Sequence, residues 1–166
     1  VVLSPKACSE LTSKFNDASL IIEPSDIRVY KDAEYANQGL EVASKMEDCD
    51  VLIGVKEVPI EALVPNKKYF FFSHTIKKQP YNRKLLQAML AKNIEFYDHE
   101  VITAENGGRL VAFGRYAGIV GAYNGFRAYG LKYKTFQLPK AETLLDQQEL
   151  ISELKKIKLP NIKILL

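Results

Sequence analysis

The apolar positions of the chain fall into two patterns. Four apolar runs are bounded by charged or turn residues, which is typical of strands covered on both faces in a parallel sheet. The runs are "SLIIEP" (19–24), "CDVLIGV" (49–55), "KYFFFS" (68–73) and "IEFYD" (94–98). Other segments have apolar residues at helical spacing or helix start and stop signals. These predicted helices cover 5–15, 32–38, 82–92, 115–131 and 142–157.

Strands that alternate with helices predict an α/β domain with a mostly parallel sheet. We expect a flavodoxin-like or Rossmann-like three-layer arrangement. Ser4 followed by Pro5 predicts the start of the first helix, because serine caps helices and proline suits the first helical position. The segment "GGRLVAFG" (107–114) predicts either a short strand or an irregular approach to a helix, and "PNIKILL" (160–166) predicts a closing strand.

Composition narrows the class of protein. The chain has 166 residues, about the length of one domain, with 47% hydrophobic and 26% charged residues. Its net charge of +3 is too weak a basic excess to indicate a nucleic-acid partner. No run approaches the ~20 apolar residues that span a membrane, and the first residues do not resemble a signal peptide. Two cysteines without metal-ligand spacing favour reduced thiols, no metal site and a cytoplasmic location.

Titratable side chains follow three of the predicted strands. Lys56 and Glu57 follow the run at 49–55, His74 and Lys77 follow the run at 68–73, and Glu100 follows the run at 94–98. Ligands of open parallel sheets bind beyond the carboxyl ends of the strands, and neighbouring strands are about 4.8 Å apart. We therefore expect Lys56 and His74 to share one cleft. A lysine, a histidine and a carboxylate can set an acid and a base at different pH values.

Each of these residues also has a structural interpretation, which the pattern alone favours. A Lys-Glu pair after a strand usually forms a solvated turn, and a lone histidine at a strand end is more often hydrogen-bonded than catalytic. His99 is the weaker of the two histidines, because its acidic neighbours indicate a solvated loop. Arg109 lies in "ENGGRL" (105–110), a predicted hairpin or loop, as an anion contact or a surface arginine.

A glycine-rich stripe lies along the predicted helix at 115–131. Glycine destabilises a helix by about 1 kcal/mol relative to alanine, so its repetition at Gly114, Gly118, Gly121 and Gly125 calls for a reason. The spacing predicts close packing against the sheet or against a second domain. A phosphate loop is the alternative, although no strand-to-G-x-G-x-x-G turn precedes the glycines.

Four segments resemble one family closely. They are "LIGVKEVP" (52–59), "FFFSHTIKKQ" (70–79), "FYDHE" (96–100) and "GGRLVAFGRYAGIVG" (107–121). They resemble the N-terminal domain of saccharopine dehydrogenases and lysine-2-oxoglutarate reductases. That domain shares its fold with alanine dehydrogenase and the transhydrogenase N-terminal domain. "FFSHTIK" with "RLVAFGRYAG" favours the saccharopine branch, whereas "VKE" before a histidine-bearing strand is common to the whole superfamily.

The resemblance implies an NAD- or NADP-dependent enzyme that acts on the C–N bond of an amino acid, with an amino acid or a 2-oxo acid as its small-molecule substrate. The family's catalytic lysine corresponds to Lys56, which would act on the substrate amine. Its catalytic histidine corresponds to His74, which would exchange protons with an imine or carbinolamine intermediate. The residues that correspond to its substrate side are Glu57, Lys77, Glu100 and Arg109. The dinucleotide would bind to a C-terminal Rossmann domain.

Two family features are absent from the sequence. Family members have an arginine-bearing loop before the "LSP" segment and a glycine-rich turn after "IKILL". We therefore expect residues 1–158 to form a substrate and catalytic domain. Residues 159–166 would be its last strand or the first strand of a dinucleotide-binding domain. Alone, the chain is expected to bind no dinucleotide and to be inactive. The alternatives are an alanine dehydrogenase-like enzyme and a non-catalytic flavodoxin-like module, and oligomer formation stays open.

Overall fold

The structure is a computed structural model that describes residues 1–164. It confirms the expected α/β fold, in which helices alternate with strands and the two small sheets are both parallel. The chain divides into two compact units, Val1–Ala112 and Phe113–Leu166. No helix in the described part of the chain is long and apolar enough to cross a membrane.

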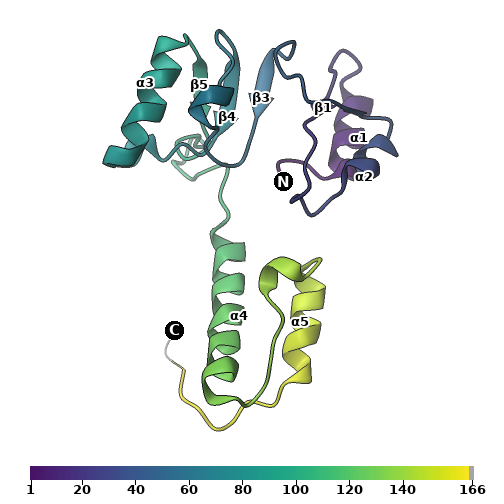
Figure 1. Ribbon diagram of the computed structural model, residues 1–166, viewed down its shortest axis with the longest axis vertical. Coiled ribbons are helices and arrows are strands. Elements are labelled where there is room, and N and C mark those ends of the chain that lie inside the picture. Colours follow the sequence, from purple (N-terminus) through teal and green to yellow (C-terminus); the bar gives the residue numbers. More distant parts are fainter. Residues whose placement is uncertain (165–166) are drawn as a thin grey trace. The chain divides into compact units, whose positions relative to one another are not determined.

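The larger sheet of the first unit has three strands in the order β3-β4-β5 (Figure 1). They are β3 (Val51–Ile53), β4 (Lys68–Phe71) and β5 (Glu95–Asp98), and each lies inside a predicted apolar run. The central strand β4 pairs in parallel with both neighbours. The carboxyl ends of all three strands therefore meet at one edge of the sheet.

Helix α3 (Arg83–Ala91) connects β4 to β5 and covers one face of this sheet (Figure 1). The core between them is formed by buried residues of the helix, of β4 and of the loop before β4. They are Leu63, Tyr69, Phe71, Leu85 and Met89. On the opposite face Val51, Ile53 and Tyr97 are exposed. The sheet is thus anchored to α3 through alternate residues of β4, as the side-chain period of a strand requires.

A second, two-stranded sheet lies in the same unit. Strand β1 (Ile21–Ile22) pairs in parallel with β2 (Glu41–Val42), and the connection between them contains α2 (Asp32–Ala36). Helix α1 (Pro5–Lys14) begins as predicted, with the Ser4 hydroxyl accepting a hydrogen bond from the Ala7 N–H. The sequence pattern missed β2, because it is only two residues long and one of them is charged.

The second unit consists of two helices and their connection. Helix α4 (Gly114–Tyr133) is followed by a short 3₁₀ turn, η4 (Ala141–Thr143), and by α5 (Gln147–Lys156). A helix was expected from residue 142, but α5 begins later because the Asp146 carboxylate caps it by accepting from the Glu149 N–H. Tyr123, Leu138 and Leu150 form the buried core of this unit.

The glycines of α4 differ in what surrounds them. A Cβ at Gly130 would lie 2.5 Å from Phe136, so this glycine is required for the close approach of the following loop. At each of the four glycines of the predicted stripe, an added Cβ would have no neighbouring atom of the second unit within 4 Å. Packing inside the second unit therefore does not explain the stripe, and its expected packing partner stays a prediction.

The predicted strand at 160–166 falls partly outside the described residues. Residues 160–164 form neither helix nor strand, and Leu165 and Leu166 are not among the residues described. The expected division of the chain into 1–158 and 159–166 stays a prediction. The irregular alternative for the approach to α4 is correct, because 107–113 contains only an isolated antiparallel bridge between Thr103 and Arg109.

Candidate active site

The candidate site lies at the carboxyl edge of the β3-β4-β5 sheet. Backbone hydrogen bonds continue past the strands, from the Phe72 N–H to the Val55 carbonyl (3.2 Å) and from the His99 N–H to the Phe71 carbonyl (3.0 Å). These bonds keep the chain after each strand close to its neighbour. They bring the segment after β3 and the segment after β5 to the two sides of His74, which follows β4.

His74 is the centre of a charged cluster. Its Nδ1 atom lies 3.1 Å from Glu100 Oε2, and its Nε2 atom lies 3.8 Å from Glu57 Oε1. Lys77 Nζ lies 3.2 Å from Glu100 Oε1 and 3.2 Å from His74 Nδ1. The structure thus brings together four of the six residues expected at the site.

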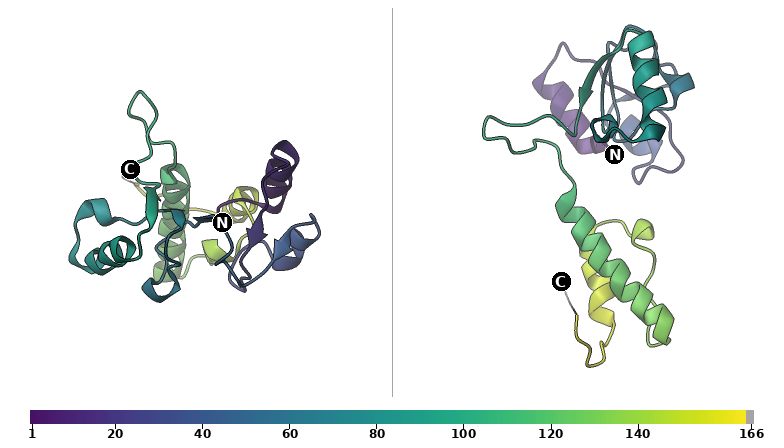
Figure 2. Two further views of the ribbon diagram at one scale, coloured as in Figure 1. Left: turned by 90° about the horizontal axis from the view of Figure 1, so that it is seen from above. Right: turned by 90° about the vertical axis from the view of Figure 1, so that its left-hand side faces the viewer.

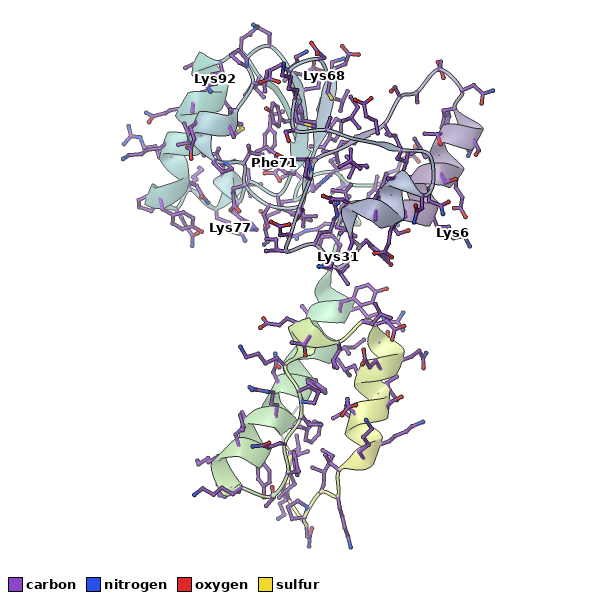
Figure 3. The ribbon with its side chains drawn as sticks, turned by 45° about the vertical axis from the view of Figure 1, so that its right-hand side comes forward. Lys6, Lys31, Lys68, Phe71, Lys77 and Lys92 are labelled. Carbon is purple, nitrogen blue, oxygen red and sulfur yellow. The ribbon has the colours of Figure 1, made fainter. Side chains whose placement is uncertain are left out.

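A short 3₁₀ turn, η2 (Thr75–Lys77), returns Lys77 to the histidine. The turn begins at His74, whose φ of +55° places it in the left-handed region that residues with a Cβ rarely adopt. Figure 3 shows Lys77 beyond one end of β4 and Lys68 at the other, with Phe71 between them. His74, in its left-handed conformation, is therefore the residue at which the chain leaves the buried strand and bends toward the cluster.

The contacts of the His74 ring define where its protons can lie. If Nδ1 carries the proton, it donates to Glu100, and Nε2 is left as an acceptor on the side of Glu57. If Nδ1 is unprotonated, it accepts from Lys77 instead. Both arrangements use the same atoms, so a proton can move within the cluster without a change of fold. Such a group is suited to exchange protons with a bound substrate.

Asp98 and Ser73 hold the ends of β4 and β5 together beneath the cluster. Asp98 Oδ2 accepts from the Ser73 hydroxyl at 2.5 Å, and Asp98 Oδ1 accepts from the Glu100 N–H at 2.9 Å. Both residues are buried. They are the last residues of the apolar runs 68–73 and 94–98, and the sequence pattern assigned them no role. The signal was a serine and an aspartate at the same position relative to two neighbouring apolar runs.

The Glu100 carboxyl is the most deeply placed charge of the cluster, with its side chain 8% exposed. Burial alone would raise its pKa and is the largest single influence on it. Hydrogen bonds from His74 and Lys77 and the charges of these two residues act in the opposite direction, and together they hold the pKa of Glu100 below its usual value. Glu100 is therefore a fixed negative charge beside the histidine at neutral pH.

Lys56 and Arg109 stand apart from the cluster. Lys56 is exposed after β3, and its side chain has no ion pair or hydrogen bond with any residue in the range 1–164. Arg109 is exposed in the hairpin after β5, likewise without a side-chain partner among the described residues. The two carboxylates expected at the site, Glu57 and Glu100, both contact His74 and not Lys56. Both cations are left available to a ligand.

The segment around His99 is more buried than the sequence pattern indicated. The expectation of a solvated loop is wrong, because Asp98 and Glu100 are buried and the His99 ring packs against Phe72, with ring centroids 5.3 Å apart. Hydrogen bonds to Ser73, just after β4, and to His74 hold the two acidic neighbours of His99 in buried positions. The His99 ring packs against Phe70 and Phe72, and its Nδ1 atom is buried without a hydrogen-bond partner among the described residues.

The site lies in a parallel α/β domain. One histidine, two carboxylates and one lysine meet there at the carboxyl edge of the strands, and together they form a candidate acid–base site. Residues 1–120 match the sequence profile of the family described as "Alanine dehydrogenase/PNT, N-terminal domain". The chain belongs to this family, and the match covers all six residues expected at the site. The resemblance expected from the sequence is confirmed.

Curated relatives are similar to the chain over most of its length. It is 36% identical to alpha-aminoadipic semialdehyde synthase from Arabidopsis thaliana over 123 residues, or 72% of the chain, and 39% identical to the mitochondrial bovine enzyme of the same name over 68% of the chain. It is 30% identical to saccharopine dehydrogenase [NAD(+), L-lysine-forming] from Yarrowia lipolytica over 87% of the chain. The matched part is 12% of each of the first two relatives and 42% of the third.

Proposed function

We propose that the chain is the substrate-binding and acid–base domain of an NAD- or NADP-dependent amino-acid oxidoreductase of the saccharopine dehydrogenase type. One observation carries the proposal, the cluster of Glu57, His74, Lys77 and Glu100 at the carboxyl edge of the sheet. The relatives support it, because their names describe an L-lysine-forming saccharopine dehydrogenase that uses NAD(+) and an alpha-aminoadipic semialdehyde synthase.

In the proposed reaction His74 takes up and returns the proton of the substrate nitrogen or of a water that adds to the carbon beside it. Glu100 supplies a fixed negative charge beside His74 Nδ1, and the Lys77 ammonium group lies next to the same carboxylate. Glu57 lies on the Nε2 side of the ring, where it can receive a positively charged substrate amine. A general acid–base group must both accept and donate a proton. These contacts give His74 a neighbour for each of the two steps.

Lys56, the second residue expected to be catalytic, and Arg109 are proposed to contact the substrate. Each is exposed and has no ion pair with the described residues, so each can meet a substrate carboxylate or carbonyl without losing an internal contact. An amino acid joined to a 2-oxo acid carries several carboxylates. Two available cations in addition to an acid–base group suit such a substrate better than alanine, which has only one carboxylate. This difference favours the saccharopine type over the alanine dehydrogenase type.

The dinucleotide is proposed to bind to residues outside this chain. Pyrophosphate binding in such folds uses free backbone N–H groups of a glycine-rich turn at a helix N-terminus. The glycines at 118, 121 and 125 lie inside α4, where the N–H groups are bonded within the helix. These residues do not fit a dinucleotide. When bound by its own domain, the nicotinamide would accept or supply the hydride, and the residues described here would handle the protons.

Turnover assays of the intact protein test the proposed function. Saccharopine, lysine with 2-oxoglutarate, and alanine should each be tried with both nicotinamide dinucleotides. The expected result is turnover with saccharopine or with the lysine and 2-oxoglutarate pair. Turnover with alanine alone would favour the alanine dehydrogenase type, which the family description also includes. No turnover with any of them would favour the non-catalytic module.

A calorimetric titration of the isolated chain tests its assignment as a substrate domain. We expect a folded chain that does not bind NAD(H) or NADP(H) at ~0.15 M salt, a concentration that screens weak attraction by scattered lysines. Micromolar binding would overturn the assignment. The expected cytoplasmic location stays a prediction, and the bovine and mouse relatives carry the word mitochondrial in their names.

A further inference from the structure

The dipeptide Asn-Gly occurs twice in the chain, at Asn106-Gly107 and at Asn124-Gly125. An asparagine before a glycine is open to attack on its side-chain carbonyl by the backbone nitrogen of the next residue, because glycine has no Cβ to hinder the approach. Attack requires the backbone to leave regular helical geometry. The two sites differ in this respect, since Asn106 lies in an exposed loop and Asn124 lies inside helix α4.

The loop that carries Asn106 connects β5 to α4 and projects from the sheet of the first unit (Figure 2). A single bridge between Thr103 and Arg109 closes it, and Gly107 has a φ of +79°. The Gly108 N–H donates to Asn106 Oδ1 at 3.0 Å. A Cβ at Gly108 would lie 3.1 Å from that oxygen, so a glycine here lets the side chain fold tightly over the following backbone.

We propose that Asn106 is a site of spontaneous deamidation. The Gly107 nitrogen forms a bond to Asn106 Cγ and loses its proton, and the side-chain nitrogen leaves with that proton as ammonia. The resulting five-membered succinimide then reacts with one water. Cleavage of one C–N bond of the ring gives aspartate, and cleavage of the other gives isoaspartate with the backbone running through Cγ. The sum is one amide and one water converted to one carboxylic acid and one ammonia, with no oxidation or reduction.

The fold assists this reaction at Asn106. The hydrogen bond from Gly108 reaches the oxygen on which negative charge develops when the ring closes, as an oxyanion contact does in acyl transfer. All residues from 105 to 110 are exposed, so water reaches the succinimide. The Gly107 N–H donates to the Ala104 carbonyl at 2.9 Å and must be released. Release in a solvent-exposed turn requires little free energy, because loop tips open locally at low cost.

The fold opposes the same reaction at Asn124. The backbone N–H of Gly125 is bonded within α4, and both residues are in the interior of a helix that continues for two turns on either side. Ring closure there requires a local opening of the helix. The added negative charge at Asn106 lies three residues from Arg109 and lowers the net charge from +3 to +2. If Arg109 binds a substrate carboxylate, as the proposed function holds, deamidation weakens that attraction.

Peptide mapping by mass spectrometry after storage of the purified chain in mildly alkaline buffer tests the proposal. We expect aspartate and isoaspartate to form at Asn106 at least about tenfold faster than at Asn124, since a helix opening of about 1.4 kcal/mol already gives that factor. In concentrated urea the two rates should converge. Asn106→Gln should remove the fast reaction and leave the rate at Asn124 unchanged.

Equal rates at the two sites in the folded chain would overturn the proposal, as would a faster rate at Asn124. A difference that persists in full in urea would also overturn it, because the local sequence and not the fold would then set the rates. The measurement needs no substrate or dinucleotide. Its result is therefore independent of whether the proposed oxidoreductase function is correct.

Discussion

The two edges of the β3-β4-β5 sheet both carry lysines and carboxylates, but they hold these charges differently. At the amino edge Lys68 and Glu95 are 3.9 Å apart, with side chains 52% and 54% exposed, beside an open hollow. At the carboxyl edge Glu100 is almost fully buried and contacts both His74 and Lys77 at 3.1 to 3.2 Å. Composition alone does not distinguish the edges.

The difference shows that the arrangement of charges, and not their number, marks a candidate site. Exposed pairs are screened by water and salt and contribute about 0 to 1 kcal/mol. A buried carboxylate that accepts hydrogen bonds from His74 and Lys77 has a lowered pKa and keeps its charge at neutral pH. Only the carboxyl edge combines a titratable histidine with such a partner among the described residues, and it is the edge at which parallel sheets bind ligands.

The largest expected effect is on catalysis. We expect His74→Ala in the intact enzyme to lower kcat by about 10²- to 10⁴-fold, which is the usual contribution of a general acid–base group. Lys68→Ala at the amino edge is the matched control and should leave kcat unchanged. Steady-state assays with the best substrate of the wild-type enzyme measure both. An unchanged kcat for His74→Ala, with a normal melting temperature, would mean that His74 is structural.

The next effect is on stability. Glu100→Gln keeps the size of the side chain but removes the charge that His74 and Lys77 contact, so we expect a loss of about 1 to 3 kcal/mol in the free energy of unfolding. Glu95→Gln, the equivalent change at the amino edge, should cost less than about 0.5 kcal/mol. Urea denaturation of the isolated chain compares the two. Equal losses would remove the distinction between the edges.

A smaller effect is expected in the pH dependence of stability. The pKa of Glu100 is lower in the folded than in the unfolded chain, so its ionised form stabilises the fold. This contribution is present in full above the unfolded value of about 4.3, and it is lost as the pH falls from there through the lower folded value. Glu100→Gln should lack this part of the acid destabilisation. Melting temperatures measured from neutral to acidic pH would contradict the account if both proteins gave parallel curves.

The smallest effect belongs to the exposed ion pair. A double-mutant cycle on Lys68 and Glu95 should give a coupling energy below about 0.5 kcal/mol, and added salt should reduce it further. The same cycle on Lys77 and Glu100 should give a larger coupling that salt changes less, because one partner is buried. A coupling at the amino edge as large as that at the carboxyl edge would show that burial does not separate the two pairs.

The sequence predicted the strands of the larger sheet and the helices of the first unit well, because their apolar runs and caps are local signals. It placed Lys56 and His74 after two strands that are neighbours in the structure, and the cleft that these two residues are expected to share stays a prediction. It did not predict that Glu57 turns toward His74 and not toward Lys56, since side-chain direction after β3 depends on contacts with β4.

Two further features of the structure were not predicted from the sequence, each for its own reason. The acidic residues beside His99 appeared typical of a solvated loop, but hydrogen bonds to Ser73 and His74 draw Asp98 and Glu100 inward. Strand β2 escaped prediction because two residues carry no period. Contacts with residues distant in sequence therefore explain the wrong expectation around His99, and the shortness of β2 explains why that strand was missed.

The central claim is that His74 is the proton-transferring group of the carboxyl edge. The most direct test is the pH dependence of kcat/KM for the intact wild-type enzyme and for His74→Ala. The account predicts an ionisation in the wild-type profile that disappears in the variant, whose residual activity then varies less with pH. A variant profile with the same ionisation as the wild type would contradict the account, because the proton would then be handled by another group.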